Sequence, residues 1–453
     1  MSTDQAVVPG RSLTGPPEAP QAELPSSGHS RSWYRWVLLA IVLLSLAFRV
    51  AYVLAAKPGD ELKGDQFYYS IQARLIADGR GFEEPFNDGA AAADHPPLTA
   101  LVVASVSWGS DPVMRQRLLM AFLGAGVVWL VGLLGTRVVG RRGGLIAAGL
   151  TGLYAAFWMN DGLVMSETLS ALCIAGLLLV VYWYLDAPSA GRAALIGLLT
   201  GLTALARAEM LLVIPLVLVP VMLLRRFGAP AERAARWGHL GLALGVTVAS
   251  LAPWTVFNLS RFERPVLLST NEGLTIYGAN CPETFAGPAI GFWSINCALD
   301  YPMPAGVDQS EKSVVFRRAG LDYLKDNLDR LPAVFVARQL RVWSLPWRLD
   351  QMVFYNTGEG REPWASWTGI VQFWLLVPVA VAGGVVLHRR RVRLLPLVAM
   401  PVLVFIVATL FYGLPRFRLP AEIAFVVLAA AALDQGWSWL RRPKAAVAPT
   451  DAA

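Results

Sequence analysis

The residue whose type and position best suit a chemical role in this sequence is Asp65, which follows Gly64 at the start of a segment with helical spacing. A carboxylate in such a place can act as a general base, withdrawing the proton of a hydroxyl group as that group attacks another molecule. The alternative interpretation is a helix N-cap, whose carboxylate accepts hydrogen bonds from backbone N–H groups one turn further along. The two roles are compatible, because a cap also orients the carboxylate.

Two arginines near the ends of apolar runs are placed where they could bind an anionic ligand. Arg416 and Arg418 lie in a short connection between two apolar runs, near 394–412 and 419–437. Because a guanidinium binds phosphate or carboxylate through two hydrogen bonds, both are candidates for binding a phosphate. Snorkelling toward lipid phosphates is the alternative for these two. Further phosphate-binding candidates are Arg207, Arg341 and His95; a solvated loop histidine is the alternative for His95.

Several carboxylates lie unusually close to apolar runs. Asp161, Glu167 and Glu209 are each within a few residues of such a run. Because a carboxylate next to lipid is costly, it indicates a functional site, and we expect these residues to bind substrate together with Tyr69. Solvation at a hairpin turn, or a local ion pair between Arg207 and Glu209, is the alternative explanation.

The composition indicates a membrane protein. The chain has 453 residues, of which 55% are hydrophobic and 16% charged, and its mean hydropathy is +0.49. Soluble domains carry about 25% charged residues, so a water-soluble globule is disfavoured. The net charge of +7 arises from basic residues at the ends of apolar runs. That pattern is typical of membrane proteins and gives no support to a nucleic-acid partner.

Ten apolar runs are candidate membrane spans, since crossing a bilayer takes about 20 apolar residues. The predicted fold class is therefore an all-α polytopic membrane protein, a bundle of about ten transmembrane helices with outward-facing loop helices and a small extracytoplasmic segment. Two runs, 193–206 and 209–224, are short and separated by charged residues. The ten runs are 36–56, 116–136, 143–160, 166–185, 193–206, 209–224, 238–257, 366–387, 394–412 and 419–437.

The basic clusters in short connections predict the orientation. If both termini are cytoplasmic, every short basic cluster falls on the cytoplasmic side, as expected for a multi-pass protein of the plasma membrane. Two long polar segments then face outward. The predicted divisions are a disordered cytoplasmic tail (1–32), a transmembrane core (33–257) with a first outward loop (57–115), an extracytoplasmic segment (258–365), C-terminal transmembrane helices (366–440) and a cytoplasmic tail (441–453).

Two of the three cysteines are expected to form a disulfide. Cys281 and Cys297 lie sixteen positions apart in the second outward segment, on the oxidising side of the membrane. Cys173 lies within an apolar run and is expected to be inert. The chain has no Walker loop, dinucleotide fingerprint, His-Glu-x-x-His or Gly-x-Ser-x-Gly motif. An activated substrate must then arrive by another route, and a polyprenyl-phosphate carrier already in the bilayer would suit.

Taken in order, these motifs resemble the GT-C superfamily of glycosyltransferases, in particular the protein-O-mannosyltransferase-like glycosyltransferase family 39 of actinobacterial type. The resemblance covers nearly the whole chain after the N-terminal tail. The residues that carry it are Gly64-Asp65-Gln66-Phe67-Tyr68-Tyr69, Asp94-His95-Pro96-Pro97-Leu98, Met165-Ser166-Glu167-Thr168-Leu169, Ala206-Arg207-Ala208-Glu209, Gly278-Ala279-Asn280-Cys281 through Cys297, and Arg416-Phe417-Arg418-Leu419-Pro420.

The resemblance implies transfer of a sugar from a polyprenyl-phosphate donor to an acceptor hydroxyl on the outer face, with inversion and with Asp65 as general base. The acceptor would be a glycan, a lipid or a protein, and membrane lipid would surround the donor. Many relatives have an Asp-Glu pair where this chain has Asp65-Gln66, so the second acid of that pair is absent. No metal ligand is assigned, and a divalent metal is left open as a cofactor.

Other functions fit part of the pattern. A transporter or flippase of a lipid-linked sugar would share the arginines but need no general base. A non-enzymatic membrane assembly factor would use both outward segments as partner surfaces. An acyl or phosphoryl transferase lacks the expected nucleophile pair or metal cluster in this sequence.

Overall fold

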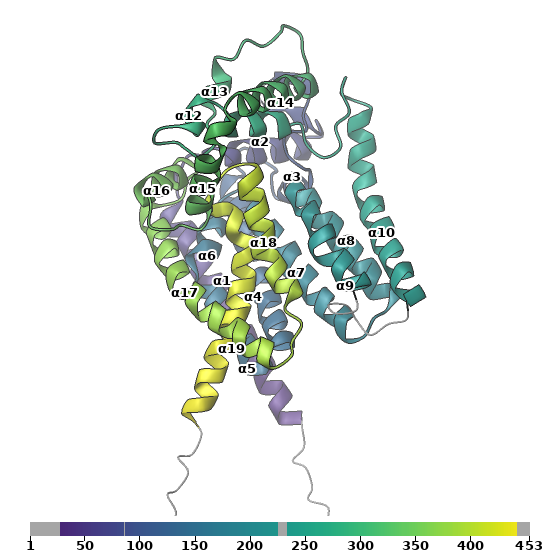
Figure 1. Cartoon of the computed structure of the whole chain (residues 1–453), viewed down its shortest axis with the longest axis vertical. Helices are drawn as coiled ribbons and strands as arrows, with labels where there is room; N and C mark the ends of the chain where they lie inside the picture. Colours follow the sequence, from purple (N-terminus) through teal and green to yellow (C-terminus); the bar gives the residue numbers. More distant parts are fainter. Residues whose placement is uncertain (1–27, 86, 225–232, 442–453) are drawn as a thin grey trace, which may run out of the picture.

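The computed structural model describes residues 28–441, except 86 and 225–232 (Figure 1). The predicted tails, 1–32 and 441–453, lie largely outside the described residues. Helices make up nearly all the regular structure, and the described strands form a single two-stranded antiparallel sheet. The predicted all-α fold class is confirmed.

The membrane bundle is built from helices of very different length. Among the described residues, five helices are long and apolar enough to cross a bilayer. They are α1 (Gly28–Ala56), α4 (Val113–Val138), α7 (Ser166–Asp186), α10 (Arg233–Leu259) and α17 (Pro363–Arg389). Further helices complete the bundle: α5 (Arg141–Leu153), α6 (Ala155–Asp161), α8 (Ala190–Ala206), η1 (Ala208–Leu212), η2 (Ile214–Leu218), α9 (Val219–Leu223), α18 (Leu395–Leu410) and α19 (Leu419–Leu440). The count of ten spans stays a prediction.

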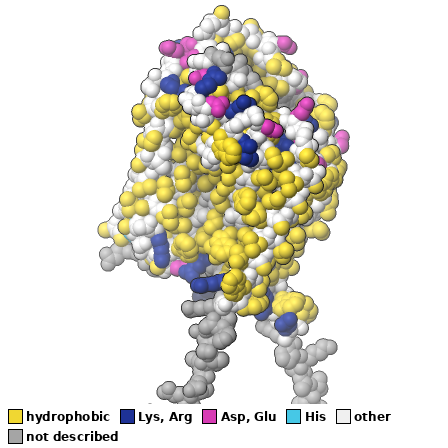
Figure 2. Space-filling model, turned by 180° about the vertical axis from the view of Figure 1, so that it is seen from behind, with side chains coloured by type: hydrophobic (Ala, Val, Ile, Leu, Met, Phe, Trp, Pro, Cys, Tyr) yellow, Lys and Arg dark blue, Asp and Glu magenta, His cyan; other side chains and the backbone are white. Residues whose placement is uncertain are grey.

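The central helix of the bundle is α19, which packs against α17, α18 and α5 (Figure 1). Its first half is buried almost without interruption. On the face seen from behind, hydrophobic side chains cover the middle of the molecule, whereas most charged side chains lie toward its two ends (Figure 2). An apolar band between two charged ends is the surface that a bilayer requires.

One predicted span is broken. The run 143–160 was expected to be continuous, but the helix ends at Leu153 and restarts at Ala155. Tyr154 between them is extended, with φ −75° and ψ 120°. The Ala155 N–H donates instead to Oε1 of Gln372 in α17, at 2.7 Å. A side chain from a distant helix thus accepts the hydrogen bond that the broken helix leaves without a backbone partner. The hydrophobicity of the run itself could not predict this break.

The two long polar segments fold together as an outer layer. The first contributes α2 (Asp65–Ala77), β1 (Glu83–Glu84), β2 (Asn87–Ala91) and α3 (Leu98–Ala104). The second contributes α11 (Glu272–Ala279), α12 (Pro282–Phe285), α13 (Asn296–Leu299), α14 (Gln309–Asp326), η3 (Leu328–Arg330), α15 (Leu331–Val342) and α16 (Leu349–Gly358). The last turn at this end is η4 (Pro415–Arg418).

This outer layer lies at one end of the molecule, whereas the start of α1 and the end of α19 lie at the other (Figure 1). The two polar segments therefore share a face, and that face is opposite the described ends of α1 and α19. Which of the two faces is cytoplasmic stays a prediction.

Candidate functional site

A cavity of about 1740 Å³ lies between the outer layer and the ends of the bundle helices. Segments far apart in the sequence line it, including the start of α2, the loop before α3, the break after α8, the end of α16 and η4. The cavity thus gathers most of the polar motifs that the sequence singles out.

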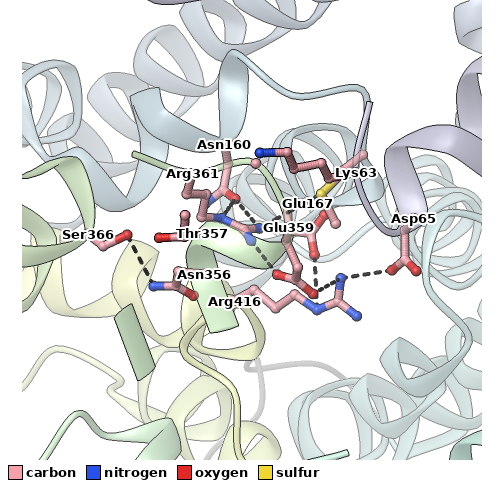
Figure 3. A network of polar contacts seen from close by, with 12 residues as sticks. Lys63, Asp65, Asn160, Glu167, Asn356, Thr357, Glu359, Arg361, Ser366 and Arg416 are labelled. Atoms are coloured by element: carbon pink, nitrogen blue, oxygen red, sulfur yellow. Dashed lines mark hydrogen bonds and ion pairs between the residues drawn. The ribbon is translucent and has the colours of Figure 1, made fainter. Parts of the chain in front are cut away.

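Asp65 and Arg416 meet in this cavity. Nη1 of Arg416 lies 2.8 Å from Oδ2 of Asp65, although the two residues are 351 positions apart (Figure 3). The Asp65 side chain is 33% exposed and that of Arg416 only 10%. The N-cap interpretation of Asp65 is wrong, because Gly64 (φ 57°) precedes the helix and Asp65 is its first residue. Its carboxylate faces a guanidinium rather than the helix backbone.

Arg416 is shared among several carboxylates of the described chain. Its Nη1 lies 2.9 Å from Oε1 of Glu359, and its Nε lies 3.8 Å from Oε1 of Glu167. Nη2 also contacts the hydroxyl of Tyr412 at 3.3 Å. Figure 3 shows Asp65, Glu167 and Glu359 converging on this one guanidinium. Arg416 is therefore the hub of the site.

Arg207 forms a second centre of charge beside the first. Its Nη1 lies 2.8 Å from Oε1 of Glu167, and its Nε lies 2.7 Å from Oε1 of Glu209. The helix α8 ends at this residue, whose extended backbone (φ −151°, ψ 117°) turns the side chain into the cavity. Its guanidinium lies 5.2 Å from the ring centre of Phe417. The break between the two short predicted spans, 193–206 and 209–224, thus places Arg207 at the cavity wall.

Glu359 and Arg361 also belong to this network, although neither was predicted from the sequence. Glu359 pairs with both Arg416 and Arg361. Arg361 donates from Nε and Nη2 to Oδ1 of Asn160, at 3.0 and 2.8 Å. An acid and a base placed directly before an apolar run, as here before α17, was the available signal.

Gln66 holds the loop that carries Glu359. Its Nε2 donates to the backbone oxygen of Glu359 at 2.9 Å. Gly360, which follows Glu359 in the chain, has φ 90°, and a Cβ at this position would lie 2.5 Å from Nε2 of Gln66. Only glycine fits this close approach. The amide of Gln66 thus lies beside an acid, Glu359, from a different segment of the chain.

His95 lies between two tyrosines at the cavity wall. Its ring stacks on Tyr69 with a centroid distance of 4.9 Å and meets Tyr68 edge-on at the same distance. Tyr69, His95, Glu167, Arg207 and Glu209 therefore all lie within the group that surrounds Asp65 and Arg416.

The charges around Asp65 determine its protonation. Burial alone would raise the pKa of this carboxyl, but the guanidinium of Arg416, assisted by His95 and Arg207, lowers the pKa to about 2. Asp65 is therefore ionised at neutral pH.

The ion-pair network of the site contains more acids than bases. Its four carboxylates face three guanidinium groups: Asp65, Glu167, Glu209 and Glu359 face Arg207, Arg361 and Arg416.

Three of the predicted site residues lie outside both the cavity lining and the ion-pair network of Asp65, Arg207 and Arg416. Arg418 pairs with Glu422 at 2.6 Å and donates to Ser344 Oγ at 2.8 Å. Arg341 donates to the backbone oxygens of Ile290 and Pro288, both at 2.7 Å. Asp161 pairs with Arg49, whose Nε lies 2.6 Å from Oδ2. Each is buried with protein partners, which is the arrangement of a residue that holds elements together.

No group of three or more His, Cys, Asp or Glu side chains is arranged to hold a metal ion in the described ranges of the chain.

A disulfide joins Cys281 and Cys297 in the outer layer. The segment between them carries Trp293, Ser294 and Asn296 into the cavity lining. Closing a loop of this size restricts the unfolded segment and is worth about 3 kcal/mol in the chain-entropy model.

Replacing both cysteines by serine is therefore expected to loosen this wall of the cavity, increasing proteolysis of residues 281–297 and lowering any activity of the site severalfold. Limited proteolysis followed by peptide mass spectrometry measures the first effect. Cys173→Ala, at a buried free cysteine in α7, is the control and should leave the cleavage pattern unchanged. Equal protease resistance of the double variant would contradict a supporting role for the disulfide.

Comparison with solved structures identifies the fold. The apo oligosaccharyltransferase of Archaeoglobus fulgidus superimposes with a TM-score of 0.53 at 14% identity, covering 92% of this chain and 52% of that chain. The same enzyme, AglB, in complex with an inhibitory peptide and a dolichol-phosphate, gives a TM-score of 0.50 at 13% identity, covering 91% and 51%. The chain has the GT-C glycosyltransferase fold.

The GT-C likeness extends over this chain but not over the archaeal enzyme, because the chain spans about half of that enzyme's length. ArnT from Cupriavidus metallidurans bound to undecaprenyl phosphate also matches, at 15% identity over 91% of this chain and 79% of that chain, with a TM-score of 0.39 that supports no argument. No protein-family model and no curated protein sequence matches this GT-C chain.

Proposed function

We propose that this chain is a membrane glycosyltransferase that transfers a sugar from a polyprenyl-phosphate donor to an acceptor hydroxyl at the outer face of the plasma membrane, with both termini in the cytoplasm. One observation carries the proposal: an ionised carboxylate, Asp65, lies 2.8 Å from the guanidinium of Arg416. The pair lies in a large cavity between the outer layer and the ends of the bundle helices of a GT-C fold. The acceptor is a glycan, a lipid or a protein.

The donor lipid has an apolar surface beside this pair. Val248, Leu251 and Val256 of α10 line the cavity together with Val407 and Phe411 of α18 and the loop after it. These residues belong to membrane helices, so a polyprenyl chain would pass between them into the bilayer. Its phosphate would then lie near Arg416 and Arg207, because these are the guanidinium groups at the polar end of the same cavity.

Donor binding must disturb the ion pairs of the site. A phosphate brings negative charge to a network that already holds more carboxylates than guanidinium groups, so one carboxylate has to give up its cation. Asp65 is the most exposed of the four, at 33%, against 18% for Glu359, 19% for Glu209 and 1% for Glu167. We therefore assign Asp65 as the carboxylate that the donor phosphate displaces from Arg416.

The displaced carboxylate becomes a better base. Without the guanidinium at 2.8 Å, the pKa of Asp65 rises from about 2, and its oxygen is free to accept the proton of the acceptor hydroxyl. The hydroxyl oxygen forms a bond to C1 of the sugar while the bond from C1 to the phosphate oxygen breaks. The phosphate leaves with the electron pair, and Arg416 and Arg207 offset its growing charge. One displacement inverts the configuration at C1.

The pH dependence of transfer should reveal this displacement. The acid limb of kcat/KM for the donor reports the free enzyme, where Asp65 has its pKa near 2, and the acid limb of kcat reports the donor complex. Because a carboxyl with a lowered pKa loses its base function only as the pH falls through that pKa, the limb of kcat should lie at higher pH than the limb of kcat/KM. Coincident limbs would mean that Asp65 keeps its cation throughout.

Reconstitution tests the activity itself. The purified chain in phosphatidylcholine vesicles is incubated with polyprenyl-phosphate sugars that carry different labelled hexoses or pentoses, together with a delipidated envelope extract as acceptor. Release of polyprenyl phosphate coupled to label in the extract is expected for one of the donors. Movement of intact donor across the bilayer without release would instead support a flippase.

A further inference from the structure

The cavity is larger than one substrate needs. Its volume of about 1740 Å³ exceeds the roughly 300–1,000 Å³ of a typical small-ligand site. The donor phosphate and its base occupy the end near Arg416. The outer end, bounded by α11 and α14, is left for another molecule.

One face of α14 lines this outer end. Ser310, Ser313 and Arg317 are spaced three and four residues apart, so they share a face of the helix, and all three line the cavity together with Arg318. Arg264, from the connection after α10, lines the same region, and its backbone N–H donates to Ser310 Oγ at 3.0 Å. We call Arg264, Arg317 and Arg318 the arginine mouth.

The guanidinium groups of the arginine mouth form fewer ion pairs than those of Arg207 and Arg416 in the inner site. Arg317 pairs weakly with Glu272, at 3.6 Å, and both side chains are about half exposed. Arg264 and Arg318 are exposed, and within the described parts of the chain neither side chain forms an ion pair or hydrogen bond. By contrast, Arg207 and Arg416 each contact at least two carboxylates. Among the described arginines that line the cavity, those of the mouth are therefore the more available to an incoming anion.

We propose that the arginine mouth binds carboxylate or phosphate groups of the acceptor, and that the acceptor is therefore an anionic saccharide. The assignment of this ligand as the acceptor rests on the proposed transfer function. Guanidinium groups bind such oxyanions through paired hydrogen bonds. The hydroxyls of Ser310 and Ser313, on the same face of α14, can hydrogen-bond the sugar hydroxyls between the charges.

The placement favours an acceptor over the headgroup of a bilayer lipid. The mouth lines the same cavity as Asp65 and Arg416, and Ser294 and Asn296 of the disulfide-closed segment add further polar groups to its wall. A saccharide held by its charges at this end can extend toward Asp65 and present a neutral hydroxyl there. The inner carboxylates would repel an anionic group at that end, so the charges also orient the acceptor.

Equilibrium binding to the full chain in phosphatidylcholine vesicles tests the proposal, with tetragalacturonate as the carboxylated probe and maltotetraose as its neutral counterpart. We expect tetragalacturonate to bind more tightly than maltotetraose and to weaken as salt is raised. The triple variant Arg264→Ala, Arg317→Ala, Arg318→Ala should lose about tenfold or more of the tetragalacturonate affinity. Lys325→Ala, which removes an exposed base of α14 outside the cavity lining, should bind as the wild type does.

Three results would overturn the proposal: equal binding of the two tetrasaccharides, unchanged affinity in the triple variant, or tighter binding of a soluble short-chain phosphatidylglycerol that the triple variant loses. The last would assign the mouth to lipid headgroups. The probe needs no donor and no transfer. Mouth-dependent binding by a chain that releases no polyprenyl phosphate would therefore reject the proposed function while the anion site stands.

Discussion

Replacing Asp65 with Asn is expected to lower sugar transfer by about 10²- to 10⁴-fold and at the same time to tighten the binding of polyprenyl phosphate. The amide cannot accept the acceptor's proton, which explains the loss. It also cannot compete with the phosphate for Arg416, from which Asp65 lies only 2.8 Å away. Release of polyprenyl phosphate measures the first effect, and a titration with a fluorescent polyprenyl phosphate in vesicles measures the second.

Asp60→Asn is the matched control for this variant. Asp60 belongs to the same outward loop, is 26% exposed and pairs with Lys57 at 3.4 Å, but it does not line the cavity. Its replacement should leave transfer and lipid binding near the wild-type values. Undiminished transfer by Asp65→Asn would remove Asp65 from the mechanism and favour a transporter, which needs no base. Unchanged lipid affinity in that variant would reject competition for Arg416.

Replacing Arg416 with Gln is expected to lower transfer by about 10²- to 10³-fold, the loss typical of removing one group that stabilises a developing negative charge. Unlike Asp65→Asn, this variant should also weaken polyprenyl phosphate binding. Arg416→Lys keeps the charge but loses the paired hydrogen bonds, so it should recover part of the binding. The same two assays measure both variants.

The Arg416 variants also leave Asp65, Glu167 and Glu359 with less positive charge nearby, so their folding must be checked by thermal unfolding in detergent. Arg74→Gln serves as the control, because Arg74 is a half-exposed arginine on α2 whose ion pair with Asp78 lies outside the cavity. It should behave as the wild type in every assay. A folded Arg416→Gln protein that binds polyprenyl phosphate normally would show that the phosphate contacts another cation.

The sequence predicted the contents of the site better than its geometry. Arg416 and Arg418 were equal candidates because both stand in one short outward connection. In the turn η4, residues two positions apart point in different directions, so Arg416 reaches Asp65 while Arg418 turns to Glu422 and Ser344. The packing of α15, α18 and α19 around the turn decides which arginine faces the cavity, and no local sequence pattern predicts that packing.

The structure also gives Asp161 a partner that was not predicted from the sequence. Asp161 was expected to bind substrate because a carboxylate beside an apolar run is costly. The structure meets that cost with Arg49, an arginine within the apolar run of α1. Glu359 was not among the candidates, although it lies just before the apolar run of α17. In both cases the decisive contact joins residues from segments far apart in the chain.

Mass spectrometry of envelope glycans, glycolipids and glycoproteins tests the central claim most directly, in cells that carry the Asp65→Asn chain as their only copy. Cells that lack the chain and cells with the Asp60→Asn chain are compared alongside. The expected result is that one sugar disappears from one class of acceptor in both the deletion and the Asp65→Asn cells, whereas the Asp60→Asn cells keep it. Retention of every envelope sugar by cells with the Asp65→Asn chain, at normal protein levels, would contradict a transferase that uses Asp65 as its base.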